Sequence, residues 1–359
     1  METYWLWLCS QKGIYQPQIK KLMDTFENPK EVFDASEKKI KSCAYLNEQQ
    51  KAKLLSSRND WEADKKKHEM AEKGIRFISL AHEEYPDNLK NITDPPYGLF
   101  VKGILPKQKT LSVGIVGARR CTYYGKQSAE QISTELAGAG VQIISGMALG
   151  IDGYSQMAAL KGGGKSFAVL GCGVDICYPQ THSNLYRQLC EHGGVISEYP
   201  PGSEPLAWHF PLRNRIISGL SDYLLIIEAR EKSGSLITAD YALEQGRDVL
   251  AVPGRMDDVL SGGCNRFIAQ GAGIILSLQD LRRTLGLDDD VRVKIRKNNI
   301  LLETEEELLY SCLDLHLKSL HEILCDVDMP VQKVLSLLTA LELKGYIEEP
   351  MKNYYAKIN

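Results

Sequence analysis

Short apolar segments alternate with helical segments over the central half of the chain. The apolar segments are four to seven residues long and cover 111–116, 141–145, 166–170, 194–197, 222–228, 248–252 and 273–277. Most segments between them are 10–25 residues long and have helical spacing, as at 125–139 and 238–245. Near-continuous apolar strands linked by helices are typical of a parallel sheet covered on both faces. The pattern predicts an α/β fold at 110–287, with an extended, Rossmann-like, doubly wound and mostly parallel sheet.

The first 80 residues follow a different pattern, with helical spacing, many lysines and almost no glycine. They predict a small helical domain at 1–80, whose lysines we expect on solvated helix faces. Prolines and glycines then concentrate at 81–109, which predicts an irregular connector.

The C-terminal part predicts a charged linker at 288–302 and a winged-helix domain at 303–359. Helical segments at 304–313, 318–325 and 331–344 are followed by an extended segment at 354–356. The third helix is expected to expose three uncharged residues, one basic residue and one acidic residue, namely Gln332, Ser336, Thr339, Lys333 and Glu342. A basic helix face would favour DNA contact. This composition favours protein docking or a structural role for the winged helix. DNA contact stays open as the alternative.

Composition and charge narrow the function only slightly. The 359 residues are 43% hydrophobic and 25% charged, as in ordinary globular proteins of two or three domains. The net charge is −3 for the whole chain; it is +3 over 1–80, +2 over 100–285 and −6 over 300–359, and the residues between these ranges carry the remainder. A polyanionic partner must therefore be held by local groups, and the acidic C-terminal part is the least favourable place for it.

Several features predict a soluble cytoplasmic protein without a cofactor. The start of the chain lacks the features of a signal peptide, and no apolar run reaches the roughly 18 residues of a membrane span. The nine cysteines are scattered without a CxxC pair, which indicates reduced thiols. The histidines show no metal-ligand spacing, so we expect no metal site.

Glycine-rich turns with polar and cationic residues lie next to the predicted strands. In a parallel sheet, ligands bind where strand ends meet the starts of helices, whose free N–H groups favour anions. Several such ends with neighbouring cations suit a chain of phosphates better than one dinucleotide. The candidate residues for binding a nucleic-acid strand are Gly117, Arg119, Arg120, Ser145, Gly146, Gly164, Lys165, Phe167, Asn214 and Arg215.

Two common nucleotide sites do not fit the sequence. The first turn, at 114–119, is not GxGxxG, and Ser145 and Gly146 stand where an acidic residue would bind ribose. No GxxxxGK[ST] motif occurs, which excludes a Walker phosphate loop.

Several motifs taken together resemble the DprA/Smf family of DNA-processing proteins. They include GIVGARRCTYYG (114–125), SGMALGID (145–152), FPLRNRIISGLSD (210–222) and SGGCNRFIAQGAG (261–273). The similarity runs in order through 110–277, and both terminal domains match the family's architecture, the first as a SAM or helix-hairpin-helix-like domain. Mild departures are Ala118, where the family usually has Ser, and Ser166, where Thr is common.

The resemblance implies a non-catalytic function. Members of the family bind single-stranded DNA, form homodimers through the Rossmann-like domain and load the RecA recombinase onto incoming strands in natural transformation. It further implies that Arg119 and Lys165 contact DNA.

The residues themselves leave some of these roles open. Lys165 could be a solvated turn lysine, and Arg120 could contact phosphate or face outwards. Phe167 could stack on a base or pack in the core.

Arg213 and Arg215 could contact DNA or form internal ion pairs with Glu198 or Asp222.

Two other functions remain as alternatives. Phosphoribohydrolases share a similar core and carry a PGGxGTxxE pattern, but that pattern fails at 234–241 and its glutamate falls on Tyr241. A transcription regulator acting through the winged helix is the third possibility, and the acidic charge there disfavours it.

Overall fold

The computed structural model describes residues 1–287, 304–314 and 317–357. The predicted linker at 288–302 lies outside this range. The chain divides into a larger unit, 1–121 with 128–288, and a smaller unit, 289–359 with 122–127. No helix in the described residues is both long enough and apolar enough to cross a membrane.

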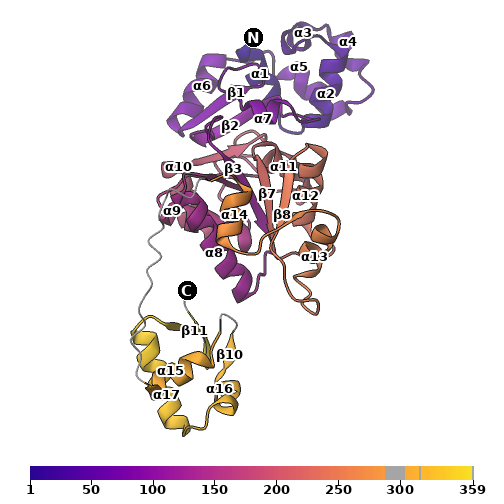
Figure 1. Ribbon diagram of the computed structural model, residues 1–359. Coiled ribbons are helices and arrows are strands. Elements are labelled where there is room, and N and C mark those ends of the chain that lie inside the picture. Colours follow the sequence, from indigo (N-terminus) through magenta and orange to yellow (C-terminus); the bar gives the residue numbers. More distant parts are fainter. Residues whose placement is uncertain (288–303, 315–316, 358–359) are drawn as a thin grey trace. The chain divides into compact units, whose positions relative to one another are not determined.

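The larger unit is built on one mixed sheet, which has nine strands within residues 1–287. Its order is β1-β2-β6-β5-β4-β3-β7-β8-β9 (Figure 1). The strands are β1 (Ile75–Ser79), β2 (Gly98–Gly103), β3 (Ser112–Gly117), β4 (Gln142–Ser145), β5 (Ser166–Val169), β6 (Gly194–Ser197), β7 (Tyr223–Ile227), β8 (Asp248–Ala251) and β9 (Gly273–Ile274). Strands β3 to β9 pair in parallel, so the predicted mostly parallel, doubly wound sheet is confirmed.

Strands β1 and β2 are the main difference from the prediction. Both pair antiparallel, β1 with β2 and β2 with β6, so the segment expected to be an irregular connector carries a strand of the sheet. Pro95 and Pro96 precede β2 and leave its hydrogen bonds intact, and Gly103 ends the strand with a positive φ of 87°.

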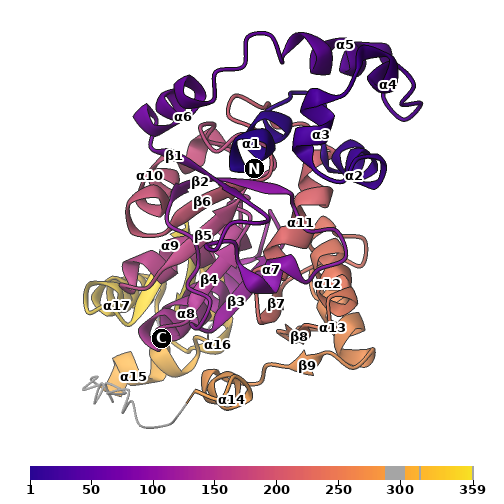
Figure 2. The same cartoon turned by 90° about the horizontal axis from the view of Figure 1, so that it is seen from above.

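Helices cover both faces of the sheet (Figure 2). They are α8 (Tyr123–Gly138), α9 (Ile151–Lys161), α10 (Ser183–His192), α11 (His209–Gly219), α12 (Gly234–Glu244), α13 (Gly262–Ala269) and α14 (Leu278–Thr284), with a 3-10 turn, η1 (Gln180–His182). The helix pair α9 and α10 contacts one face, and α11, α12 and α13 belong to the buried cluster on the other. The strands are therefore buried on both faces, as their continuous apolar sequence requires.

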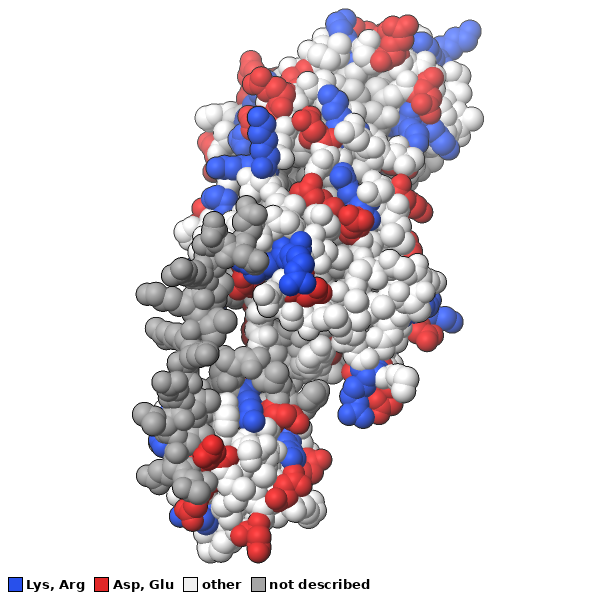
Figure 3. All heavy atoms as spheres, viewed as in Figure 1, with Lys and Arg blue, Asp and Glu red and all other residues white. Residues whose placement is uncertain are grey.

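The N-terminal helices pack at the β1–β2 end of the sheet (Figure 1). They are α1 (Glu2–Cys9), α2 (Gln16–Thr25), α3 (Pro29–Asp34), α4 (Glu37–Lys41), α5 (Glu48–Ser56), α6 (Ala63–Glu72) and the short α7 (Asp87–Lys90). Side chains of Asn28, Ser36 and Asn47 cap α3, α4 and α5. Trp7 and Leu22 share one buried cluster with Phe100, so these helices and the sheet have a continuous core. On the face seen in Figure 3, their lysines lie among acidic side chains at the surface.

The smaller unit has helix α15 (Thr304–Ser311), strand β10 (Lys318–Ser319), helices α16 (Leu320–Asp326) and α17 (Val331–Leu343), and strands β11 (Ile347–Met351) and β12 (Tyr354–Lys357). The strands form a small sheet in the order β10-β12-β11. Val334, Leu338 and Leu341 of α17 are buried against α15 and α16. This is the winged helix that the sequence predicts, and the five positions predicted to be exposed on α17 are exposed.

Candidate nucleic-acid interface

A pocket of about 550 Å³ lies at the carboxyl ends of β3 and β7. From β3 the chain continues to β4 on one side, and it later returns to β7 on the other side. Such a reversal of strand order leaves a crevice between the loops, where doubly wound sheets bind ligands. The pocket is walled by the loops after β3 and β7, by α11, and by the start of α12.

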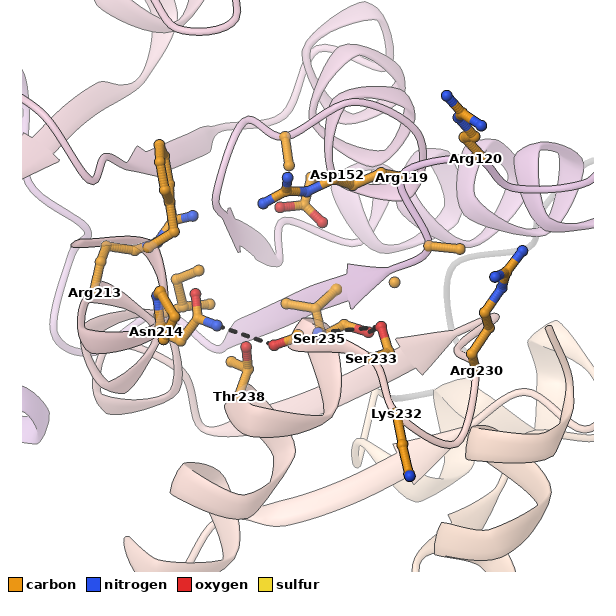
Figure 4. Close-up of a pocket in the computed structure, with 18 of the residues that line it drawn as sticks. Arg119, Arg120, Asp152, Arg213, Asn214, Arg230, Lys232, Ser233, Ser235 and Thr238 are labelled. Carbon is orange, nitrogen blue, oxygen red and sulfur yellow. Dashed lines mark hydrogen bonds between the residues drawn. The ribbon is translucent and has the colours of Figure 1, made fainter. Parts of the chain in front are cut away.

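Exposed cations dominate the lining of this pocket. Arg119 and Arg120 come from the loop after β3, and Arg230 and Lys232 come from the loop after β7 (Figure 4). Within the described part of the chain, none of these four side chains forms an ion pair. Asp152 is the one acid among the described lining residues, and it is buried. The described lining of the pocket therefore carries four exposed positive charges and one buried acid.

A buried arginine and a buried aspartate form the floor. Arg213 donates hydrogen bonds to the carbonyl oxygens of Val169 and Gly146, which ties α11 to the ends of β5 and β4. The Asp152 carboxylate accepts a hydrogen bond from the Gly146 N–H at 3.1 Å. Both groups are enclosed by protein, so they fix the shape of the pocket.

The ionisation of these two floor groups follows from burial. Burial, opposed by the nearby Asp152 and assisted by the positive charge of Arg119, lowers the pKa of the Arg213 guanidinium to about 10. Burial raises the pKa of the Asp152 carboxyl, although Arg213 acts in the opposite direction. Arg119 and Arg213 are therefore like charges close enough to interact, and an anion bound beside them would be favoured.

The backbone comes unusually close together at the strand ends. A Cβ atom on Gly117 would lie 1.9 Å from the carbonyl oxygen of Ile227, so only glycine fits there. Met147 and Glu228, just after β4 and β7, have positive φ values of 55° and 51°. Such strained non-glycine residues cluster at functional sites, and here both lie next to the pocket.

The start of α12 contributes backbone groups to the same pocket. The Ser233 hydroxyl accepts a hydrogen bond from the Ser235 N–H at 3.4 Å and caps the helix. The Asn214 side chain donates to the Gly234 carbonyl oxygen at 3.2 Å and joins α11 to α12. The positive end of the α12 dipole therefore faces the pocket.

Aromatic side chains border the pocket, and the sequence analysis missed them. Phe210 lines the pocket, and its ring centroid lies 5.4 Å from that of Tyr178, whose side chain is 44% exposed. Phe210 directly precedes the PLRNR segment, so its position next to Asn214 and the arginines was the available signal. The two rings offer an apolar surface beside the cations.

The structure brings four of the predicted site residues together, because Gly117, Arg119, Arg120 and Asn214 all line the pocket. Ser145 and Gly146 are buried and are not among the lining residues. The buried Ser145 hydroxyl donates to the Ile115 carbonyl oxygen at 2.6 Å.

Gly164 and Lys165 lie elsewhere, at the amino end of β5. This edge is separated from the pocket by the length of the strand, roughly 13 Å at about 3.3 Å per residue. Gly164 packs against α8, since a Cβ there would lie 2.6 Å from the Cβ of Ala137. Lys165 is exposed, and its DNA contact stays a prediction.

Two predicted DNA-binding residues are corrected by their burial. Phe167 is fully buried between the sheet and its helices, so the packing role applies and its ring is not offered to a base. Arg215 donates two hydrogen bonds to the Glu198 carboxylate, at 2.9 and 2.6 Å, with both side chains nearly buried. The internal ion pair is therefore the role of Arg215.

Catalytic and metal-binding groups are sparse. Among the described residues, no three His, Cys, Asp or Glu side chains lie close enough together to hold a metal ion. Tyr241, at the position where the hydrolase pattern has its glutamate, lines another cavity with Tyr15 and Tyr199.

Comparison of the sequence with known proteins identifies one family and several relatives. The family model for DNA recombination-mediator protein A matches residues 76–286. The chain is 45% identical to DNA processing protein DprA of Bacillus subtilis, over 58% of this chain and 71% of that protein. It is 38% identical to protein Smf of Escherichia coli, over 76% of this chain and 74% of that protein.

Solved structures of DprA proteins are similar to this fold. The X-ray structure of DprA from Streptococcus pneumoniae aligns with a TM-score of 0.67 and 35% identity, over 79% of this chain and 98% of that one. DprA from Helicobacter pylori, whose structure describes a single-stranded DNA binding mode, aligns with a TM-score of 0.53 and 31% identity, over 59% of this chain and 95% of that one. The chain belongs to the DNA recombination-mediator protein A family, which includes DprA and Smf.

Proposed function

We propose that this protein binds single-stranded DNA in the pocket at the ends of β3 and β7. The observation that carries the proposal is the set of four exposed cations, Arg119, Arg120, Arg230 and Lys232, with no exposed acid among the described lining residues. Cationic grooves bordered by aromatic rings suit unpaired strands, because phosphates bind the cations and bases stack on the rings. Phe210 and Tyr178 supply such rings here.

We further propose that the bound strand is passed to the RecA recombinase during natural transformation, without a bond-breaking step. Family membership supports this role, and the pocket floor supports its non-catalytic character. Arg213 and Asp152 are both held in internal hydrogen bonds, so neither is placed to act on a substrate. A cytoplasmic location belongs to the same proposal.

A homodimer through the Rossmann-like domain is also part of the proposal. Strand β9 ends the sheet, and Ile274 within it and Leu276 just after it are exposed. An open strand edge with apolar neighbours is a surface that proteins normally cover. A second copy of the chain is the partner that we propose for it.

The site is tested by reversing its charge. We expect the Arg119→Glu, Arg230→Glu double variant to lose binding of a fluorescent 20-nucleotide oligothymidylate by at least about 100-fold, because each reversal places an acid beside a phosphate. Fluorescence anisotropy at fixed salt measures the affinity. The wild type should bind the single strand more tightly than a duplex of equal length.

The matched control reverses two exposed lysines, Lys67→Glu in α6 with Lys73→Glu directly after it, which changes the net charge by the same amount. This control should bind as the wild type does. Equal affinity of the wild type and the Arg119/Arg230 variant would refute the proposed site.

A further inference from the structure

A second hollow adjoins the candidate pocket on the other side of the loop after β3. It has a volume of about 570 Å³ and shares Arg119 and Arg120 with the first pocket. Figure 4 shows Arg119 extending towards Asp152, whereas Arg120 points away from it. The two arginines therefore stand between two neighbouring hollows and can serve both.

The second hollow is lined by the loop after β4, by α9 and by the segment around η1. We call it the Tyr154 hollow; its lining residues are Arg119, Arg120, Cys121, Leu149, Gly150, Gly153, Tyr154, Met157, Thr181, His182, Asn184 and Leu185. None of these residues is an Asp or Glu, so the two arginines set the sign of its charge. A polyanion entering it meets no carboxylate among the described lining residues.

Apolar side chains are exposed inside this hollow. Tyr154, on α9, is 38% exposed and Leu149 is 45% exposed. An aromatic ring on a helix next to two arginines has the composition of a base-stacking platform. The first pocket has the same combination in Phe210 with its cations.

The wall of the hollow is tightly packed at two glycines. A Cβ on Gly150 would lie 2.2 Å from the Ala118 carbonyl oxygen, and one on Gly153 would lie 2.5 Å from Cε1 of His182. Gly150 also has a positive φ of 75°, directly before α9 begins, and no side chain caps that helix start. The N–H groups of Ile151 and Gly153 donate to the carbonyl oxygens of Ala118 and Ala148, which ties the start of α9 to the loops after β3 and β4.

We propose that the Tyr154 hollow is a second subsite for the same DNA strand. Phosphates cross Arg119 and Arg120, and a base on the far side stacks on the Tyr154 ring beside Leu149. This inference rests on the proposed function and extends it, because it makes the strand path longer than one pocket. It also assigns a DNA-contact role to a tyrosine outside the first pocket.

The test compares oligothymidylates of about 4 to 16 nucleotides, bound by the full chain in anisotropy titrations. We expect Tyr154→Ala to bind the shortest oligonucleotides as the wild type does, and the longer ones about 10-fold more weakly. Tyr154→Phe should restore the affinity, since the ring provides the stacking. Tyr354→Ala is the matched control, because Tyr354 is 39% exposed and lies outside both hollows.

A 2-aminopurine base placed at successive positions of a long oligonucleotide gives a second readout. Its fluorescence should be quenched at positions that stack on Tyr154, and Tyr154→Ala should remove only that quenching. Equal binding of all lengths by wild type and Tyr154→Ala would overturn the second subsite while leaving the first pocket intact. Failure of the wild type to bind any single strand would overturn the proposed function and this inference together.

Discussion

Arginine has two opposite roles in the central domain of this protein. Arg119 and Arg120 are exposed and unpaired within the described residues, whereas Arg213 and Arg215 are buried and held by internal acceptors. The sequence showed that all four lie at strand ends or in the segment preceding a strand. The sequence did not decide whether Arg213 and Arg215 contact DNA or form internal ion pairs, because their burial depends on how α11 packs against the sheet. The half-buried Phe210 was missed and the fully buried Phe167 was retained for the same reason.

The buried ion pair leads to a stability prediction. Glu198→Ala should lower the free energy of unfolding by about 3–5 kcal/mol, because it leaves the Arg215 guanidinium buried without its partner. Asp34→Ala removes the exposed pair with Lys30 and should cost less than about 1 kcal/mol. Urea unfolding monitored by circular dichroism measures both changes. Similar losses in the two variants would contradict the structural role of Arg215.

Most elements of the central domain could be predicted because their sequence pattern is local. Strand β6 was predicted with its observed bounds, and β3, β4, β5, β7 and β8 were predicted to within one residue at each end. Strand β9 has only two residues, although five were predicted. Strands β1 and β2 were missed because their pairing is non-local. They follow a lysine-rich helix and a pair of prolines, and their place in the sheet depends on contact with β6.

The edge strand β9 allows a test of the proposed homodimer. Leu276 is 71% exposed beside β9, so we expect Leu276→Glu to shift the protein from dimer to monomer. A buried carboxylate at a subunit interface is costly when no partner neutralises it. Light scattering after size-exclusion chromatography measures the mass. The exposed Leu343→Glu, on α17, is the control and should stay dimeric; a monomeric wild type, or a dimeric Leu276→Glu variant, would contradict the proposed interface.

Across the whole molecule, charge is divided between regions with different surfaces. The net charge of +2 over 100–285 includes the four pocket cations, whereas 300–359 carries −6. The exposed face of α17 has Val331 and Leu335 among its polar residues, and Lys333 there is paired with Glu305 at 2.6 Å. That face is poorly suited to a DNA groove, which agrees with the docking or structural role favoured by its sequence.

The sequence predicted which cations lie beside glycines at the ends of strands. It did not show, for every candidate, whether that end is the amino or the carboxyl end of the strand. Lys165 was grouped with Arg119 because both lie beside glycines next to a strand. The structure places Lys165 before β5 and Arg119 after β3, so they lie at opposite edges of parallel strands. Only the edge with Arg119 has the pocket described above.

The salt dependence of binding tests most directly whether phosphates are held at the Arg119 edge. For single strands, the slope of log affinity against log salt is about −0.7 for each neutralised phosphate. Arg119→Gln with Arg230→Gln should therefore make the slope shallower by about 1.4, whereas Lys165→Gln should change it less. A double variant that keeps the wild-type slope would contradict the account.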